Sequence, residues 1–416
     1  MKNTFNKIKC CRISGDTKLV NVGKIGPLTL TGTFLNNKKD KISTTPLDIV
    51  FSKKSNLLQL RHNYNQTKLF GDNYGYRSGL NESMKNHLET KAKILSKKIN
   101  LIKGDAILDI GSNDGTFLNS FSAKLNRIGI DPTARKFRKY YDKNIKIIPS
   151  LFNSKVLKSS NIKFKLISSI AMFYDLQDPK LFCHNVSKHL HKDGIFHIEI
   201  AYLPDILKEF SFDTFCQEHL TYFSYKSFKY MIDQTPFEII DYKRNGINGG
   251  SINFDLGFKN SKWKINKKNI NKLVQNEKKL QIDNVNTYKK FFKKIKSNSI
   301  KINLLLRKLS KKNKKIFAFG ASTKGNVILQ MCKLDNKIIK GVYDINPFKF
   351  GKYTPGNKIP IKNENEIFYD KPDYIILLIW HFKKTLKIKF KKFNKLKINF
   401  IWPFPKLKII KSLSDE

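Results

Sequence analysis

One short stretch of the sequence combines two adjacent titratable side chains with aromatic neighbours. In FDTFCQEHLTYFS, residues 212–224, Glu218 and His219 stand side by side within an aromatic run. An imidazole next to a carboxyl can accept and return a proton, because histidine titrates near neutral pH. The same pattern also fits a core histidine paired with a neighbouring group. The residues therefore leave two interpretations open, a proton-transfer site and a buried structural pair.

A second group of residues lies where an apolar run ends in a tight turn. The segment ILDIGSNDGTFL, residues 107–118, places Asp109 inside the run and a glycine at each end of the turn. Glycines let a backbone approach a ligand closely and let a helix pack on its strand. Asp131 ends the next apolar run, at the spacing where an acid binds ribose hydroxyls.

This turn departs from the G-x-G-x-x-G of dinucleotide-binding folds. It resembles the S-adenosylmethionine site of class I methyltransferases, and the alternative is an ordinary turn in which Asp131 caps a helix. The residues expected to bind the cofactor are Asp109, Gly111, Ser112, Asn113, Gly115, Asp131 and Phe152.

These residues must be positioned by an alternation of short strands and helices. Four apolar runs are separated by segments long enough for crossover helices, which predicts a parallel, doubly wound α/β sheet. Two further runs can pair as a hairpin at its edge, and an amphipathic helix with Asn81 or Ser83 as its cap precedes the sheet. The strands are expected at 105–110, 127–131, 165–170 and 194–201, the hairpin at 237–243 and 250–258, and the helix at 83–99.

The rest of the chain adds three parts to this methyltransferase-like unit, which spans residues 64–262. Residues 1–63 are short strand-like pieces and predict a small β module. Residues 263–312 predict a lysine-rich helical linker, and residues 313–416 a second, smaller α/β unit of Rossmann-like type. The expected apolar face of the linker is Phe291, Phe292, Ile295, Leu304 and Leu305. In the last unit, strands are expected at 315–320, 339–344, 374–379 and 398–404, and a helix at 327–332.

Composition limits the class of protein. The 416 residues carry a net charge of +47, but the lysines are dispersed, which we interpret as a compositional bias rather than a nucleic-acid surface. Such a charge could still attract a diphosphate. Five cysteines form no disulfide framework, and we find neither a secretory signal nor an apolar run of about 18 residues. We therefore expect a cytoplasmic protein with no membrane partner.

Several segments, taken in order, resemble the sugar C-methyltransferase family, whose members methylate a carbon of nucleotide-linked keto-deoxysugars. The resemblance runs over nearly the whole chain. It implies an N-terminal zinc-binding module, a methyl-donor domain and a C-terminal α/β domain that helps hold the sugar nucleotide. The matching segments are residues 64–88, 107–118, 198–207, 212–224, 248–253, 319–329, 343–361 and 400–405.

The resemblance also implies roles for the residues of the opening stretch. It makes His219 the catalytic base, with Glu218 beside it. Methylating a carbon requires removal of a proton next to a ketone, and the enolate then needs a hydrogen-bond donor. Tyr76 is our candidate donor, with Tyr74 second, although both could be half-buried loop aromatics. The enolate carbon would attack the methyl group in line, a step that needs no metal. The expected substrate-binding residues are Tyr74, Arg77, Tyr222, Asn248, Lys324, Asn326 and Tyr353.

Two C-terminal segments fit a diphosphate. GASTKGN, residues 320–326, follows a strand and opens a helix, where backbone amides and Lys324 suit an anion. It lacks the lysine and hydroxyl of a Walker A loop. Residues 346–360 form a basic loop around Tyr353. An ordinary solvated loop is the alternative for this second segment, as a solvated arginine is for Arg77.

The chain departs from the family pattern at several positions. Where the family's module has two C-x-x-C pairs, this chain has Cys11, Ser14, Ser52 and Ser55. A neutral hydroxyl is a poor zinc ligand, so we predict no structural zinc and a module held by packing or by its neighbours. Cys216 replaces a tyrosine that relatives often carry. Asn248 likewise replaces a histidine, and residues 171–179 lack an Asn and a His that some members have. These changes leave the substrate open, including methylation of a sugar oxygen.

Two other classes of function compete with this interpretation. A nucleic-acid methyltransferase would need a Pro-Cys nucleophile or an Asn/Asp-Pro-Pro-aromatic motif, and the chain has Ala171–Tyr174 at the latter position. A non-catalytic sugar-nucleotide or scaffold protein with a decayed site is the third possibility. We expect a nucleotide-diphosphate sugar as partner, no nucleic acid, and a monomer or weak homo-oligomer. The family implies a role in a surface polysaccharide or a glycosylated metabolite.

Overall fold

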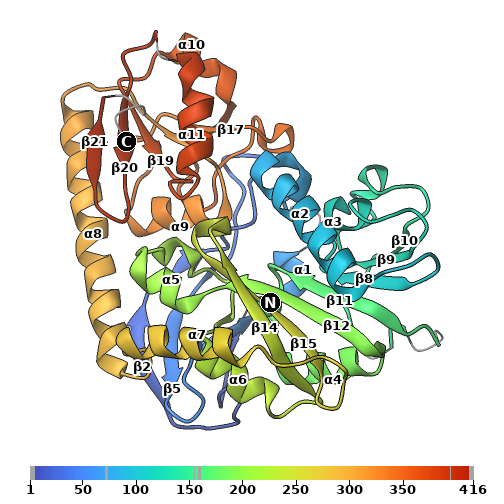
Figure 1. The fold of residues 1–416 in the computed structure, drawn as a ribbon. Helices are drawn as coiled ribbons and strands as arrows, with labels where there is room; N and C mark the ends of the chain where they lie inside the picture. Colours follow the sequence, from blue (N-terminus) through green and yellow to red (C-terminus); the bar gives the residue numbers. More distant parts are fainter. Residues whose placement is uncertain (1–4, 71–73, 154, 158–160, 394, 412–416) are drawn as a thin grey trace.

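The computed structural model describes residues 5–70, 74–153, 155–157, 161–393 and 395–411. The molecule contains two large sheets, with the C-terminal one at the upper left of Figure 1 and the other at the lower right. A small set of N-terminal strands lies beside the long helix α8, which runs along one side of the molecule (Figure 1). No helix within the described ranges is long and apolar enough to cross a membrane.

The larger sheet has seven strands in the order β10-β9-β8-β11-β12-β15-β14. Pairing is parallel from β10 through β12, whereas β15 is antiparallel to both β12 and β14. The predicted parallel sheet with an edge hairpin is confirmed, and the three-residue β10 was not predicted. The strands are β8 (Ala106–Ile110), β9 (Asn126–Ile130), β10 (Lys146–Ile148), β11 (Phe164–Ile170), β12 (Leu190–Ala201), β14 (Phe237–Asn245) and β15 (Ser251–Phe258).

Helices bury both faces of this sheet. This explains why β8 carries apolar residues on both of its faces. Helix α2 (Glu82–Ile99) begins at Asn81, whose side chain accepts a 3.0 Å hydrogen bond from the Ser83 amide. Leu88, Ala92 and Leu95 bury one face of this helix with Ile107 of β8. The opposite face of the sheet packs against α4 (Pro179–Ser187) and α6 (Tyr225–Ile232). Shorter helices are α1 (Gln66–Leu69), α3 (Thr116–Asn119) and α5 (Leu203–Lys208).

The N-terminal module shares a sheet with the segment that carries Glu218 and His219. The four strands of this sheet run β13-β6-β5-β2, and β13 (Thr221–Tyr222) begins two residues after His219. The N-terminal strands therefore hold one end of that segment. They are β1 (Phe5–Lys7), β2 (Leu19–Lys24), β3 (Leu28–Thr29), β4 (Thr44–Thr45), β5 (Asp48–Ser52), β6 (Leu57–Leu60) and β7 (His62–Tyr64).

The C-terminal sheet has six strands in the order β18-β17-β16-β19-β20-β21, parallel except for β21. This confirms the second α/β unit, while the short β18 and β21 were not predicted. Helix α9 (Thr323–Met331) begins four residues before the expected helix, because Ser322 caps it at the Gly325 amide. The remaining elements are β16 (Ile316–Phe319), β17 (Val342–Asp344), β18 (Ile361–Asn363), α10 (Ile367–Asp370), β19 (Tyr374–Leu377), α11 (Lys383–Phe390), β20 (Asn399–Trp402) and β21 (Lys408–Ile410).

The predicted helical linker consists of α7 (Lys267–Lys279) and α8 (Val285–Lys311). Its expected apolar face was wrong at Leu304, which is 62% exposed. Helical spacing from Ile295 carries the buried face through Ser299 to Ile302 and Leu306 instead. This face packs on β2 of the N-terminal module and on β16 of the C-terminal sheet.

Candidate active site

A cavity of about 1160 Å³, counted to its open mouth, lies at the carboxyl ends of β8 and β9. Ligands of doubly wound sheets bind at this edge. Six of the seven residues expected to bind the cofactor line it: Asp109, Gly111, Ser112, Asn113, Asp131 and Phe152. Phe152 packs edge-on against Phe182, another lining residue, at 5.2 Å between ring centroids.

The two acids of the cavity are held in place by different partners. Asp131 accepts hydrogen bonds from the Asn113 amide at 2.9 Å and from the Thr133 amide at 2.6 Å. Asp109 accepts one from the Ser168 hydroxyl at 2.6 Å. Burial raises the pKa of Asp109 to about 7, so a positively charged group of a bound cofactor would favour its ionised form.

The seventh residue, Gly115, shapes the turn and is not among the residues that line the cavity. Its φ is +77°, and a Cβ there would lie 2.5 Å from the Tyr141 ring. The Tyr141 hydroxyl donates to the Asn113 carbonyl and lies 2.8 Å from the Ser112 hydroxyl. Because Gly115 has no Cβ, the Tyr141 ring can pack against it and hold Ser112 and Asn113 in place.

His219 is a neutral, partly exposed imidazole. Its Nδ1 lies 2.7 Å from the Thr214 carbonyl oxygen, so Nδ1–H donates there and the lone pair is on Nε2. The Tyr174 ring packs edge-on against it at 4.5 Å. Burial, and then the charge of Lys324, lowers the pKa of His219 to about 3.

Glu218 is buried at the meeting point of three parts of the chain. Burial raises its pKa to about 7, and a hydrogen bond with Thr323 of α9 offsets this only partly. Its Oε1 has no hydrogen-bond partner among the described residues. A Cβ on Gly32 of the N-terminal module would lie 2.0 Å from that oxygen. Such an acid is available for proton transfer near neutral pH.

The Glu218–His219 pair adjoins the cofactor cavity through Tyr174 and Asp175. The Tyr174 carbonyl accepts hydrogen bonds from Leu220 and Thr221, which directly follow the pair. Asp175 lines the cavity, and burial followed by the charge of Glu218 raises its pKa well above the ordinary value.

Tyr74 and Tyr76 line the same cavity as Asp175. Tyr76 is 43% exposed as a residue, and its side chain forms a hydrogen bond with Ser78. Burial raises the pKa of Tyr74 well above its ordinary value, and the charge of Glu218 contributes next. Both tyrosines are therefore protonated at neutral pH and can donate hydrogen bonds.

A second polar cluster lies between the methyltransferase unit and the C-terminal unit. Lys324 donates to the Asn248 carbonyl at 2.7 Å, and Trp380 donates to Asp213 at 3.0 Å. Burial, then the charge of Lys324, holds the pKa of His381 well below its ordinary value. Three buried atoms of the cluster have no partner in the described part of the chain: Ser211 Oγ, Asp213 Oδ1 and His381 Nδ1.

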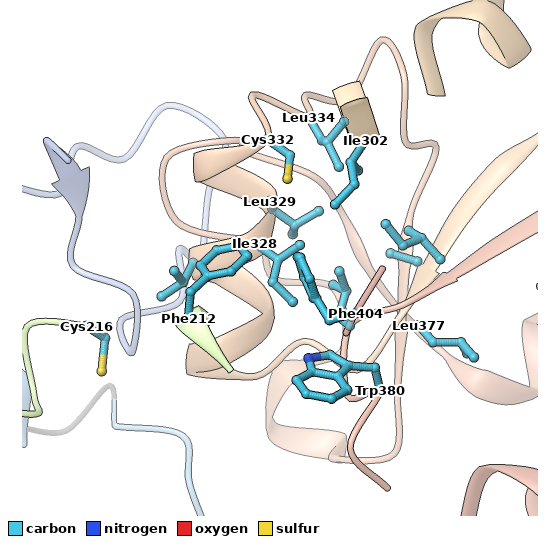
Figure 2. Packing of buried hydrophobic residues seen from close by; sticks show 14 of the residues in the cluster. Phe212, Cys216, Ile302, Ile328, Leu329, Cys332, Leu334, Leu377, Trp380 and Phe404 are labelled. Carbon is cyan, nitrogen blue, oxygen red and sulfur yellow. The ribbon is translucent and has the colours of Figure 1, made fainter. Parts of the chain in front are cut away.

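Sequence reasoning missed Asp213, Trp380 and His381. The available signal was the position of Trp380 and His381 just beyond the carboxyl end of β19, where α/β sheets bind ligands. Phe212, which precedes Asp213, packs edge-on against Phe404 of the C-terminal unit at 4.7 Å, near Ile328 of α9 (Figure 2). The two units therefore share a core beside this polar cluster.

Four expected substrate residues make contacts within the protein. Arg77 donates to Asp114 at 3.0 Å and covers the Tyr140 ring. Asn326 donates to the Thr31 carbonyl at 2.7 Å. The last two are Tyr222, which is buried with its ring 4.2 Å from that of Phe215, and Tyr353, whose backbone pairs with Leu35. Their assignment to a substrate stays a prediction.

The four positions of the family's zinc ligands converge in this structure. Cys11 Sγ lies 3.3 Å from Ser55 Oγ, and Ser14 Oγ lies 3.5 Å from Ser52 Oγ. One thiol and three neutral hydroxyls do not fit zinc, which prefers thiolate and imidazole. The positions form a hydrogen-bonded cluster in place of a thiolate one.

The N-terminal module is instead bound through Gln217 to the segment that carries Glu218 and His219. This buried side chain donates to the Leu28 carbonyl at 3.0 Å and to the Thr45 hydroxyl at 3.1 Å. It accepts from the amide and hydroxyl of Thr31. These hydrogen bonds stabilise the module against its neighbour, and they also fix the backbone next to Glu218.

The sheet order and the cofactor cavity define a class I, S-adenosylmethionine-dependent methyltransferase. A methyltransferase domain model matches residues 80–242, and a C-methyltransferase C-terminal domain model matches residues 246–405. The chain is thus a methyltransferase that carries the C-terminal domain of the C-methyltransferases.

Individual relatives are similar over all or part of the chain. The C-methyltransferase NovU of Streptomyces niveus is 27% identical over 420 residues, which covers both chains completely. A tRNA U34 carboxymethyltransferase of Campylobacter lari is 28% identical over 28% of this chain and 42% of its own.

Solved structures match about two fifths of the chain at low identity. An S-adenosylmethionine-dependent methyltransferase from Clostridium acetobutylicum has 17% identity and a TM-score of 0.32, covering 41% of this chain and 91% of its own. The N-methyltransferase NodS from Bradyrhizobium japonicum has 11% identity and a TM-score of 0.31, covering 43% and 98%.

Proposed function

We propose that the enzyme methylates a carbon next to the ketone of a nucleotide-linked keto-deoxysugar. The observation that carries this proposal is the placement of Glu218 and His219 between the cofactor cavity and the polar cluster around Lys324. A sugar spanning the two would bring its ketone to the acid–base pair and its diphosphate to the lysine. We also propose that the chain is divided into four parts. They are the N-terminal module (1–63), the methyltransferase unit (64–262), the helical linker (263–312) and the C-terminal α/β unit (313–416).

His219 is the proposed base. Its Nε2 lone pair would take the proton from the carbon next to the ketone, while the Thr214 carbonyl fixes the ring orientation. The hydroxyl of Tyr76, a residue that lines the cavity, would donate to the oxygen on which negative charge develops. S-adenosylmethionine, when bound, supplies an electrophilic methyl group. Asp109 and Asp131 would hold its charged and ribose groups.

Substrate binding would activate the base. Burial, and then the charge of Lys324, lowers the pKa of His219 in the free chain, so a diphosphate that neutralises Lys324 would remove the second of these two effects and raise that pKa. The helix α9 begins beside Lys324, and its first amides also suit a phosphate. Proton abstraction would then be efficient only with a complete sugar nucleotide in place.

Glu218 is the second candidate for the base. Its pKa of about 7 matches proton transfer at neutral pH, and its Oε1 has no hydrogen-bond partner in the described chain. Either residue could also deprotonate a sugar hydroxyl, so the same geometry supports methylation of a sugar oxygen. The site of methylation in the product distinguishes the two reactions.

The experiment that tests the proposal separates proton abstraction from methyl transfer. Purified enzyme is first titrated calorimetrically with S-adenosylhomocysteine, then incubated with it and with dTDP-, GDP- or CDP-linked 4-keto-deoxysugars in deuterated water. We expect one sugar nucleotide to exchange its proton next to the ketone, and its carbon to be methylated when S-adenosylmethionine is supplied.

Two variants assign the base in that exchange reaction. His219→Ala should abolish exchange and still bind S-adenosylhomocysteine, whereas the surface control His184→Ala should behave as the parent enzyme. Exchange that survives in His219→Ala but not in Glu218→Gln would move the role to Glu218. Folded enzyme that binds the cofactor product but exchanges none of the sugars would overturn the proposal.

A further inference from the structure

Cys216, Glu218 and His219 bring three different metal-binding atoms together. The Cys216 sulfur, a Glu218 carboxylate oxygen and a His219 ring nitrogen all lie within 4.8 Å of one another. Cys216 and Glu218 are buried, and His219 is partly exposed. Cys216 is part of the large buried apolar cluster that also contains Phe212 and Cys332 (Figure 2).

Each of the three groups has a lone pair to offer. Glu218 is 95% buried and its Oε1 has no hydrogen-bond partner among the described residues. The Nδ1–H of His219 donates to the Thr214 carbonyl, which leaves the neutral ring with a free lone pair on Nε2. A histidine oriented by a backbone carbonyl in this way is the usual form of a metal ligand. The Cys216 thiol is free.

The spacing of these atoms is close to that of a tetrahedral zinc site. Zn–S bonds of about 2.3 Å and Zn–N or Zn–O bonds of about 2.0 Å put neighbouring ligands roughly 3.3–3.8 Å apart. Side-chain movements of about an ångström would therefore bring the trio to that spacing. Three protein ligands leave a fourth position for water, and the partial exposure of His219 gives it a path to solvent.

Charge favours a divalent, thiophilic ion. A thiolate and a carboxylate together neutralise a divalent cation, so the occupied site would carry no net charge into a buried region. Lys324 is the opposing cation, but it donates to the Asn248 carbonyl and interacts with the charge of Asp213. Sulfur and imidazole ligands select zinc over magnesium or calcium.

We propose that Cys216, Glu218 and His219 form an inhibitory binding site for zinc or a similar thiophilic divalent cation. The bound ion takes the lone pair that His219 needs as a base, so methyl transfer stops until the ion leaves. This inhibitory part rests on the proposed function, whereas the binding site itself does not.

Cobalt(II) tests the binding site without any sugar nucleotide. The full-length protein, freed of metal by a chelator, is titrated with Co²⁺, and thiolate-to-cobalt charge transfer is followed by absorption. We expect one saturable band that zinc abolishes by competition. Cys216→Ser should lose the band and bind the ion at least about tenfold more weakly, because a hydroxyl is a poor ligand. Binding of S-adenosylhomocysteine checks that this variant is folded.

Cys11→Ser is the matched control, because Cys11 is the other thiol that lies among possible ligand positions. It should keep the band. Absence of the band in the parent protein, or a band lost in Cys11→Ser and kept in Cys216→Ser, would overturn the proposed site. Zinc that binds at Cys216 without slowing sugar turnover would overturn the inhibitory role alone.

Discussion

Gly32 and Glu218 touch so closely that a single methyl group could not be placed between them. A Cβ on Gly32 would lie 2.0 Å from Glu218 Oε1 and 3.6 Å from the Thr323 hydroxyl. Residues of the N-terminal module, of the segment that carries Glu218 and His219, and of the C-terminal unit therefore meet at one point. The acid of the Glu218–His219 pair is held by all three.

The first prediction concerns this contact. Gly32→Ala should displace the Glu218 carboxylate and lower kcat about 10–100-fold, because a shift of about 1 Å at a reacting group is costly. Cofactor binding should be unchanged, since Gly32 does not line that cavity. Gly246→Ala, where an added Cβ meets nothing within 4 Å, is the control. Equal kcat in the two variants would show that the contact does not position Glu218.

The second prediction concerns Gln217. Replacing it with Ala leaves the buried Leu28 carbonyl and Thr31 amide without their partners. Each unsatisfied buried group costs about 1–3 kcal/mol, so the free energy of unfolding should fall by at least that amount. Denaturant unfolding measures the loss, with the exposed Gln281→Ala as control. A variant as stable as the parent would contradict the role of Gln217 in joining the two parts.

The third prediction concerns pH. Burial raises the pKa of Asp109 to about 7, so this carboxyl is protonated below that pH and ionised above it. If Asp109 holds the positively charged part of S-adenosylmethionine, affinity should rise between about pH 6 and pH 8. Calorimetry at a series of pH values measures this. Asp109→Asn should bind more weakly, and the rise attributable to this carboxyl should be absent.

The fourth prediction concerns the hydrogen-bonded cluster of the N-terminal module. Because Cys11, Ser14, Ser52 and Ser55 already converge, the triple change S14C/S52C/S55C should create a four-thiolate zinc site. We expect one additional tightly bound zinc per chain and a higher Tm, since metal binding adds to folding stability. Carrying the change in Cys216→Ser keeps the two sites separate. No added zinc would mean that the four positions cannot reach tetrahedral geometry.

The larger sheet could be predicted because its strands are buried on both faces and read as continuous apolar runs. The short edge strands could not, since β10, β18 and β21 are three residues each and only one of their nine residues is buried. Leu304 was misplaced because an apolar residue on a lysine-rich helix need not lie on its buried face.

The residues Asp109, Gly111, Ser112 and Asn113, which line the cavity, were within reach of sequence analysis because they follow one strand–turn–helix pattern. The polar cluster was not. Asp213 and Trp380 are 167 positions apart and meet only through tertiary packing. The role of Gly32 was also hidden, because a close approach between distant residues leaves no local pattern.

Helix α8 fixes the distance and the orientation between the N-terminal strands and the C-terminal sheet, because it packs on both. Its first half is pressed against Gly23, where an added Cβ would lie 2.2 Å from the Phe292 ring, and its second half packs on β16. Each residue of a helix adds about 1.5 Å of length and about 100° of rotation. An insertion or deletion within α8 would therefore rotate Lys324 about the helix axis relative to Glu218. The number of residues in this one helix therefore sets which face of the C-terminal sheet a bound sugar would meet.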